Sequence, residues 1–121
     1  MSNPNIVGVT TIVGNNGVLS VERNALTLVN NASGSGKIYK INQIYVSNVD
    51  SASDAINVTL RNSVATTPTT TQIVNNIAIP PQATLEVLSA PFYLKENQDI
   101  QLSSLDDSGD LNAVATWEEI S

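Results

Sequence analysis

The stretch KIYKINQIYVSNVDSASDAINVTLRN, residues 37–62, decides the fold, because it reads as a strand, a polar loop and a second strand. In the first strand Ile44, Val46 and Asn48 alternate with polar or aromatic residues, and Ile56 begins a second run of the same kind. Successive side chains of a strand point to opposite faces. The alternation therefore predicts two strands that each bury one face and expose the other.

The rest of the chain repeats this pattern at short intervals. Runs rich in Val, Ile and Thr are separated by turn residues, and no segment has a 3.6-residue period. Asn16-Gly17 predicts a type I′ hairpin, and Pro80-Pro81 predicts the end of a strand because proline donates no ladder hydrogen bond. Residues 63–72, rich in Thr, predict an exposed loop that pairs in part at a sheet edge. We expect an all-β fold of about eight strands, a two-sheet β-sandwich or jelly-roll-like arrangement.

The first residues differ from an ordinary polar tail. The chain has 121 residues, enough for one domain, and residues 1–12 carry Ile6, Val7 and Val9. We expect an extended N-terminal arm over 1–12, followed by a single β-sandwich domain over 13–121. The arm pairs either with its own sandwich or, by strand addition, with another chain.

Charge and hydropathy exclude several classes of partner. The net charge is −6, and the five Lys and Arg residues are scattered, whereas binding to a phosphate backbone needs clustered cations. No run approaches the roughly 18 apolar residues of a membrane helix. The N-terminal stretch lacks the basic and apolar regions of a secretory signal. We therefore expect no nucleic acid, no membrane and no secretion.

The residue types that carry most catalysis are missing. The chain has no His and no Cys, which removes the commonest general base, metal ligand and nucleophile pairs. The acidic pairs Glu96/Asp99 and Glu118/Glu119 lie in or beside polar turns, where solvated carboxylates are expected. Glu118 and Glu119 are adjacent on one strand and so point to opposite faces. We expect no enzyme activity, no catalytic residues and no cofactor.

Two polar loops are candidates for a cation. Residues 48–54 contain Asp50 and Asp54, and residues 106–110 read DDSGD. Calcium prefers such clustered oxygens, but Asx turns use the same residues. We expect turns and assign no metal ligand, with a weak cation at either loop as the alternative.

Aromatic residues are few, and they divide between core and surface. Phe92 and Trp117 alternate with other apolar residues and are expected in the core. Tyr45 and Tyr93 fall on the opposite side of their strands, and tyrosine is enriched at protein interfaces. We expect Tyr45 and Tyr93, with the arm residues Ile6, Val7 and Val9, to form interfaces.

The order of these motifs resembles small virion structural proteins of tailed bacteriophages, notably those of cyanophages. The resemblance covers roughly residues 37–120: a strand that ends in Val46-Ser47-Asn48, a bend containing proline before TLEVL, and the segment FYLKENQDIQ. Many relatives have Leu-x-x-Gly-Asp in that last segment, whereas here Asn97 lies near the place of the glycine.

The resemblance implies a subunit present in many copies in the virion. A capsid cement (decoration) protein is expected, which binds the major capsid protein lattice as a homo-oligomer, with a trimer favoured. A neck, tail or baseplate subunit of the same particle is the first alternative. A jelly-roll carbohydrate-binding module is the second, and it would need exposed aromatic residues on one sheet face.

Overall fold

The computed structural model describes residues 11–62, 69–88, 90–105 and 111–121, which form nine strands and no helix. No helical segment in these four ranges is long and apolar enough to cross a lipid bilayer. The predicted arm residues Ile6, Val7 and Val9 lie outside the described residues. The strands are β1 (Ile12–Val21), β2 (Leu26–Asn31), β3 (Ile38–Asn48), β4 (Asp54–Asn62), β5 (Thr69–Ile79), β6 (Thr84–Glu86), β7 (Phe92–Leu94), β8 (Gln98–Ser104) and β9 (Leu111–Ile120).

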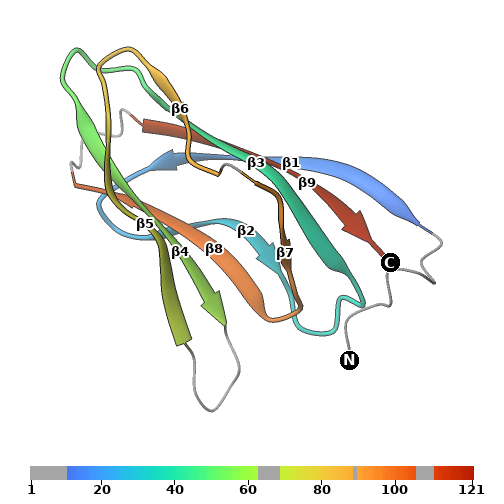
Figure 1. Ribbon diagram of the computed structural model, residues 1–121. Coiled ribbons are helices and arrows are strands. Elements are labelled where there is room, and N and C mark those ends of the chain that lie inside the picture. Colours follow the sequence, from blue (N-terminus) through green and yellow to red (C-terminus); the bar gives the residue numbers. More distant parts are fainter. Residues whose placement is uncertain (1–10, 63–68, 89, 106–110) are drawn as a thin grey trace.

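The strands make two antiparallel sheets that pack face to face (Figure 1). The first sheet has the order β1-β9-β3-β6, and β7 pairs with β3 beside β6. The second sheet has the order β2-β8-β4-β5. Some strands that are consecutive along the chain, such as β1 and β2, therefore lie in different sheets, whereas β4 and β5 are neighbours in the second sheet. The predicted all-β, two-sheet β-sandwich is confirmed.

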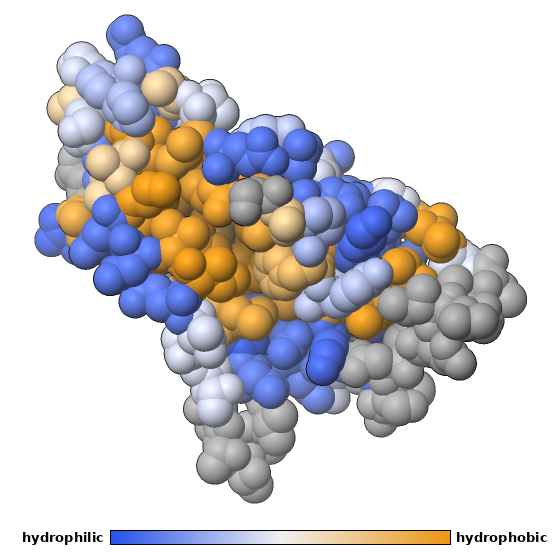
Figure 2. All heavy atoms as spheres, in the orientation of Figure 1, coloured by the Kyte–Doolittle hydropathy of each residue, from blue (hydrophilic) through white to orange (hydrophobic). Residues whose placement is uncertain are grey.

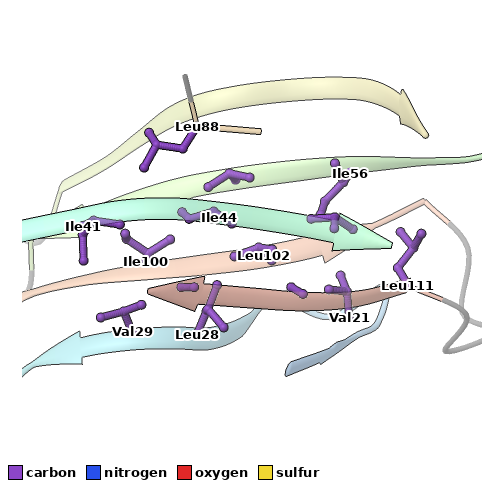
Figure 3. Packing of buried hydrophobic residues seen from close by; sticks show 14 of the residues in the cluster. Val21, Leu28, Val29, Ile41, Ile44, Ile56, Leu88, Ile100, Leu102 and Leu111 are labelled. Atoms are coloured by element: carbon purple, nitrogen blue, oxygen red, sulfur yellow. The ribbon is translucent and has the colours of Figure 1, made fainter. Parts of the chain in front are cut away.

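The core lies between the sheets and consists mainly of branched aliphatic side chains. Figure 3 shows buried residues of both sheets, such as Ile44 of β3 and Leu102 of β8, in the layer between the strands. The predicted inward residues of the opening stretch, Ile44, Val46 and Asn48, are each at most 2% exposed. Burial of one large aliphatic side chain contributes roughly 1.5–3 kcal/mol, so this layer is the main source of stability.

The predicted hairpin at Asn16-Gly17 is wrong, because both residues lie in the middle of β1. This strand pairs with β9 over its whole length without a register shift, and Gly17 is opposite Ala115. The indole of Trp117 lies against Gly17: a Cβ at this position would be 3.0 Å from the Trp117 ring and 3.2 Å from the Leu28 carbonyl oxygen. The glycine therefore makes room for a tryptophan and does not turn the chain.

Irregular strand pairing explains why buried and exposed residues do not alternate in β2. A register shift between Thr27 and Val29 leaves Leu28 as an extra residue of β2, so that Leu28 and Val29 are both buried. A β-bulge of this kind places two residues opposite one.

The Thr-rich stretch contributes its last part, from Thr69, to the edge strand β5, and β5 ends at Ile79 before Pro80 as predicted. The remainder of that stretch, 63–68, is outside the described residues.

Candidate interaction surfaces

The outer faces of the two sheets differ in chemistry. The second sheet presents polar side chains, including the row Thr27–Gln101–Thr59 across β2, β8 and β4. The first sheet presents an apolar row across β1, β9 and β3, made of Val18, Val114 and Tyr45. Val18 is 75% exposed, which is a large fraction for an apolar residue in a strand. The outer face of the first sheet is therefore the candidate surface for a protein partner.

The structure places the two predicted interface tyrosines on this same face. Tyr45 of β3 is half-buried and its hydroxyl donates a hydrogen bond to Gln43. Tyr93 of β7 is 46% exposed and lies opposite Lys40 of β3. Leu94, its neighbour in sequence, is fully buried, which fixes Tyr93 on the outside. A shared face is consistent with the predicted interface role, which itself stays a prediction.

A shallow depression of about 320 Å³ adjoins the apolar row. It is lined by residues of β1 and β9, namely Val18, Leu19, Ser20, Asn112, Ala113 and Val114. The lining has no charged group; Ser20 and Asn112 are polar, and the other four residues are aliphatic. Such a surface can receive an apolar side chain of a partner.

Sequence reasoning missed Val18 and Val114, which complete the row beside Tyr45. The signal for Val114 was present, because it alternates with the inward residues Ala113 and Ala115. Val18 was assigned to the wrong local structure when Asn16-Gly17 was interpreted as a turn. The sequence of a single strand does not say which strands are its neighbours. The row that these three residues form could therefore not be predicted.

A second apolar region lies on one side of the sandwich, between β5 and the segment that carries β6 and β7 (Figure 2). Val74 of β5 and Val87, beyond β6, are partly buried against the core there, and so is Phe92 of β7, which was expected in the core. Ile77 of β5 is 38% exposed. Val74, Val87 and Phe92 therefore pack at the edge of the core, and this explains their partial burial without a partner.

The carboxylate of Glu119 lies at one end of the sandwich, among three donors. Its oxygens accept hydrogen bonds from Asn15 Nδ2 (3.0 Å), Lys37 Nζ (3.0 Å) and the Trp117 indole (3.2 Å). Burial by itself raises the pKa of Glu119. The hydrogen bonds and the positive charge of Lys37 outweigh burial and hold that pKa below its ordinary value. Glu118 points the other way and accepts from Asn42, as predicted for adjacent residues of a strand.

The lowered pKa of Glu119 predicts a pH dependence of stability. An acid with a lower pKa in the folded chain stabilises the fold above its unfolded pKa, about 4.3, and this contribution is lost as the pH falls through the folded pKa. We therefore expect the free energy of unfolding to fall between about pH 5 and pH 3 more in the wild type than in Glu119→Gln. Urea denaturation at several pH values measures both curves, and Glu22→Gln, at an exposed position, should follow the wild type. Parallel curves for the wild type and Glu119→Gln would contradict the assignment.

The carboxylates Glu96 and Asp99 are not solvated, contrary to expectation. Asp99 is 5% exposed and accepts two hydrogen bonds from the Arg61 guanidinium, at 3.0 and 2.6 Å. Glu96 is 8% exposed and accepts the Gly36 backbone N–H at 3.0 Å. The partners come from distant parts of the chain, and each holds one carboxylate in place, Arg61 by charge and Gly36 by its N–H. Both acids therefore contribute to the structure through these partners.

The polar loop of the opening stretch is organised by Asn48. Its Nδ2 donates to the carbonyl oxygens of Ala52 (2.8 Å) and Ile79 (3.1 Å), and its Oδ1 accepts the Asp50 N–H. Asp50 and Asp54 each accept the N–H of the next residue. The bond between Asn48 and Asp50, which spans two residues, is that of an Asx turn. In the part of the chain that the structure describes, no group of three or more acidic residues is placed to hold a metal ion. The other candidate loop, 106–110, is outside that part.

Asn31 has the same role at the opposite end of the sandwich. It is fully buried, and its Nδ2 donates to the carbonyl oxygens of Lys37 (2.9 Å) and Leu94 (3.0 Å). Each of the two asparagines therefore ties the loop that follows its strand to another strand. Buried polar groups of this kind are satisfied and not available for a ligand.

The protein is a two-sheet β-sandwich. An apolar row lies on the outer face of its first sheet, and polar side chains lie on the outer face of its second sheet. Comparison of the sequence with models of known protein families and with curated proteins finds no match.

Proposed function

We propose that this chain is a non-enzymatic structural protein of a bacteriophage virion, and specifically a capsid cement protein that binds the major capsid protein lattice and stabilises the head. The single observation that carries the proposal is the outer face of the first sheet, where Tyr45, Tyr93 and Val18 are presented together. Tyrosine and exposed apolar residues mark protein interfaces, and the outer face of the second sheet offers a polar contrast.

The shape of this face suits a protein partner better than a small molecule. The depression between β1 and β9 is shallow, and no charged group lines it. A contact made by such a face is individually weak. Repetition over a symmetric lattice adds many weak contacts, because each bound copy is held near its neighbours. This is how a small subunit of ordinary affinity can reinforce a shell.

The particular assembly is supported by the resemblance over residues 37–120. That resemblance fits a neck, tail or baseplate subunit as well, and the two positions differ in copy number. Quantitative mass spectrometry of purified DNA-filled particles of the encoding phage separates them. We expect hundreds of copies per head for a cement protein, whereas a dozen or so would place the chain in a neck or tail ring. Absence from the particles would remove the proposal.

A binding experiment tests the surface itself. We expect Tyr93→Ala to weaken binding of the purified protein to heads that lack it by about thirtyfold, since truncation of an aromatic residue at an interface hot spot costs about 2 kcal/mol or more. Thr59→Ala, on the polar outer face of the second sheet, is the matched control and should bind as the wild type does. Equal binding by both variants would show that the face is not used. Saturable binding of a host polysaccharide to the wild type, lost in Tyr93→Ala, would support a carbohydrate-binding module instead.

A further inference from the structure

The edge strand β1 presents a row of backbone groups that no other strand of the described residues pairs, and within this row the Asn16 N–H donates to the Asn15 Oδ1 at 2.8 Å. Thr11 and Ser121 exchange both of their backbone hydrogen bonds, at 3.1 and 3.0 Å, and the β1–β9 register continues from there without a shift. Antiparallel pairs alternate between bonded and non-bonded positions. The N–H and C=O groups of every second residue, from Ile12 to Ser20, therefore point away from β9, toward the open edge.

The other edges of the described sheets are interrupted, and β1 is not. β2 has one register shift, and β5 has two, with Asn76 at a φ of 53°. β6 and β7 are three residues long. In contrast, β1 has ten residues in unbroken register and no charged residue or proline. Proteins normally protect long edges with bulges, charges or prolines, because an unprotected edge pairs with another strand.

We propose that β1 pairs with β1 of a second copy of this chain, antiparallel about a twofold axis, so that the two first sheets become one continuous sheet. The strand is uncharged, so two copies can approach along it although each chain carries a net charge of −6. The contact is the same patch on both copies and therefore closes at two. This pairing does not depend on the proposed role in a virion.

The sequence of β1 is complementary to itself when the axis passes through Asn16. Gly14 then lies opposite Val18 of the second copy, and Ile12 lies opposite Ser20, so that each large side chain on the outer face meets a small one. On the inner face Val13, which is 51% exposed, lies opposite Leu19 of the second copy. The even-numbered residues that face each other are those whose backbone groups point to the open edge. The ladder can therefore form with one local change, in which the Asn15 Oδ1 releases the Asn16 N–H that it accepts at 2.8 Å.

A pair of charge variants tests both the contact and its register. A Cβ at Gly14 would have no neighbour within 4 Å, and Val18 is 75% exposed, so both positions accept long side chains in the monomer. In the double variant Gly14→Lys/Val18→Lys, the proposed register places lysine opposite lysine twice, and like charges in direct opposition disfavour pairing. In Gly14→Lys/Val18→Glu, each lysine faces a glutamate.

Sedimentation velocity of the full chain from about 1 µM to about 1 mM provides the measurement. We expect the wild type to form dimers with rising concentration, the Lys/Lys variant to dimerise at least tenfold more weakly, and the Lys/Glu variant to dimerise as the wild type does. Thr59→Lys/Ser103→Lys, on the outer face of the second sheet, makes the same change of net charge and should leave dimerisation intact. Fluorescence of Trp117 verifies that each variant is folded.

Several outcomes would overturn this pairing. A wild type that stays monomeric at the highest concentration excludes it. A trimer excludes it as well, because a threefold contact needs β1 to meet a different strand. Equal dimerisation of the Lys/Lys and Lys/Glu variants would place the interface elsewhere. Loss of dimers on removal of residues 1–10, with no effect of the charge variants, would assign the contact to the N-terminal segment.

Discussion

Asn48→Asp is expected to lower the free energy of unfolding by about 4 kcal/mol at pH 7, because it replaces a buried donor with a buried negative charge. The Asn48 amide nitrogen donates to the Ala52 and Ile79 carbonyl oxygens, at 2.8 and 3.1 Å, and the residue is 2% exposed. A carboxylate of the same size cannot donate either bond, and its second oxygen would lie against the Ala52 and Ile79 carbonyl oxygens. The Ala52 and Ile79 carbonyls are left without this donor, and that of Ile79, a fully buried residue, carries the larger cost.

The half-buried Asn57 provides a control for the same substitution. Here it is the side-chain oxygen that is used: Oδ1 accepts the Asn76 N–H at 2.8 Å and the Gln72 amide at 3.3 Å. Asn57→Asp keeps that acceptor and is expected to change stability by less than about 1 kcal/mol. Urea denaturation of the two variants, followed by Trp117 fluorescence, measures the difference. Equal losses would mean that the orientation of the Asn48 amide is not what holds the loop.

The pH dependence of the Asn48→Asp variant separates charge from lost bonds. Burial raises the pKa of the introduced carboxyl group above its unfolded value, so the folded state takes up its proton first as the pH falls. The stability difference between wild type and variant should therefore shrink from pH 7 to pH 4. A difference that is constant with pH would indicate that the lost hydrogen bonds, and not the charge, dominate.

The alternation that depends on one strand alone was predictable from the sequence. Ile44, Val46 and Asn48 share a buried face as expected, and so do Ala113 and Ala115. A period of two residues is a property of the backbone, and it survives wherever the strand pairs regularly. The outward placement of Tyr45 and Tyr93 followed from the same rule. For these residues local sequence and tertiary structure agree.

Features that depend on a distant partner were not predictable. Asp99 is buried because Arg61 reaches it from β4, and the polar turn beside it gave no sign of this. Leu28 is buried beside Val29 because the β2–β8 ladder has a bulge between them. In each case the deciding contact joins segments far apart in the chain. Local preference is overridden when a tertiary contact is worth more than the roughly 1 kcal/mol that strand propensities span.

Gly17→Thr is expected to lower the free energy of unfolding by about 2–3 kcal/mol, although threonine is a better strand former than glycine. The added Cβ would lie 3.0 Å from the Trp117 ring, closer than such contacts normally come. The ring cannot move away freely. It stacks on Tyr39, with centroids 6.0 Å apart, and its Nε1 donates to Glu119 at 3.2 Å. The strain must therefore be taken up by the packing of Trp117 or by the backbone of β1.

Gly14→Thr, three residues earlier in the same strand, isolates this effect. A Cβ at Gly14 would have no neighbour within 4 Å, so the threonine brings strand propensity without overlap. We expect this variant to be as stable as the wild type or more stable by up to about 1 kcal/mol, because glycine in a strand interior is unfavourable. The chain has a single tryptophan, so a shift of its emission in Gly17→Thr, and none in Gly14→Thr, would report the displaced indole directly. If both variants were equally stable and their emission unchanged, Gly17 would not be the position that admits Trp117 to the core. Another contact would then have to explain why the pair Asn16-Gly17, which favours turns, lies within β1.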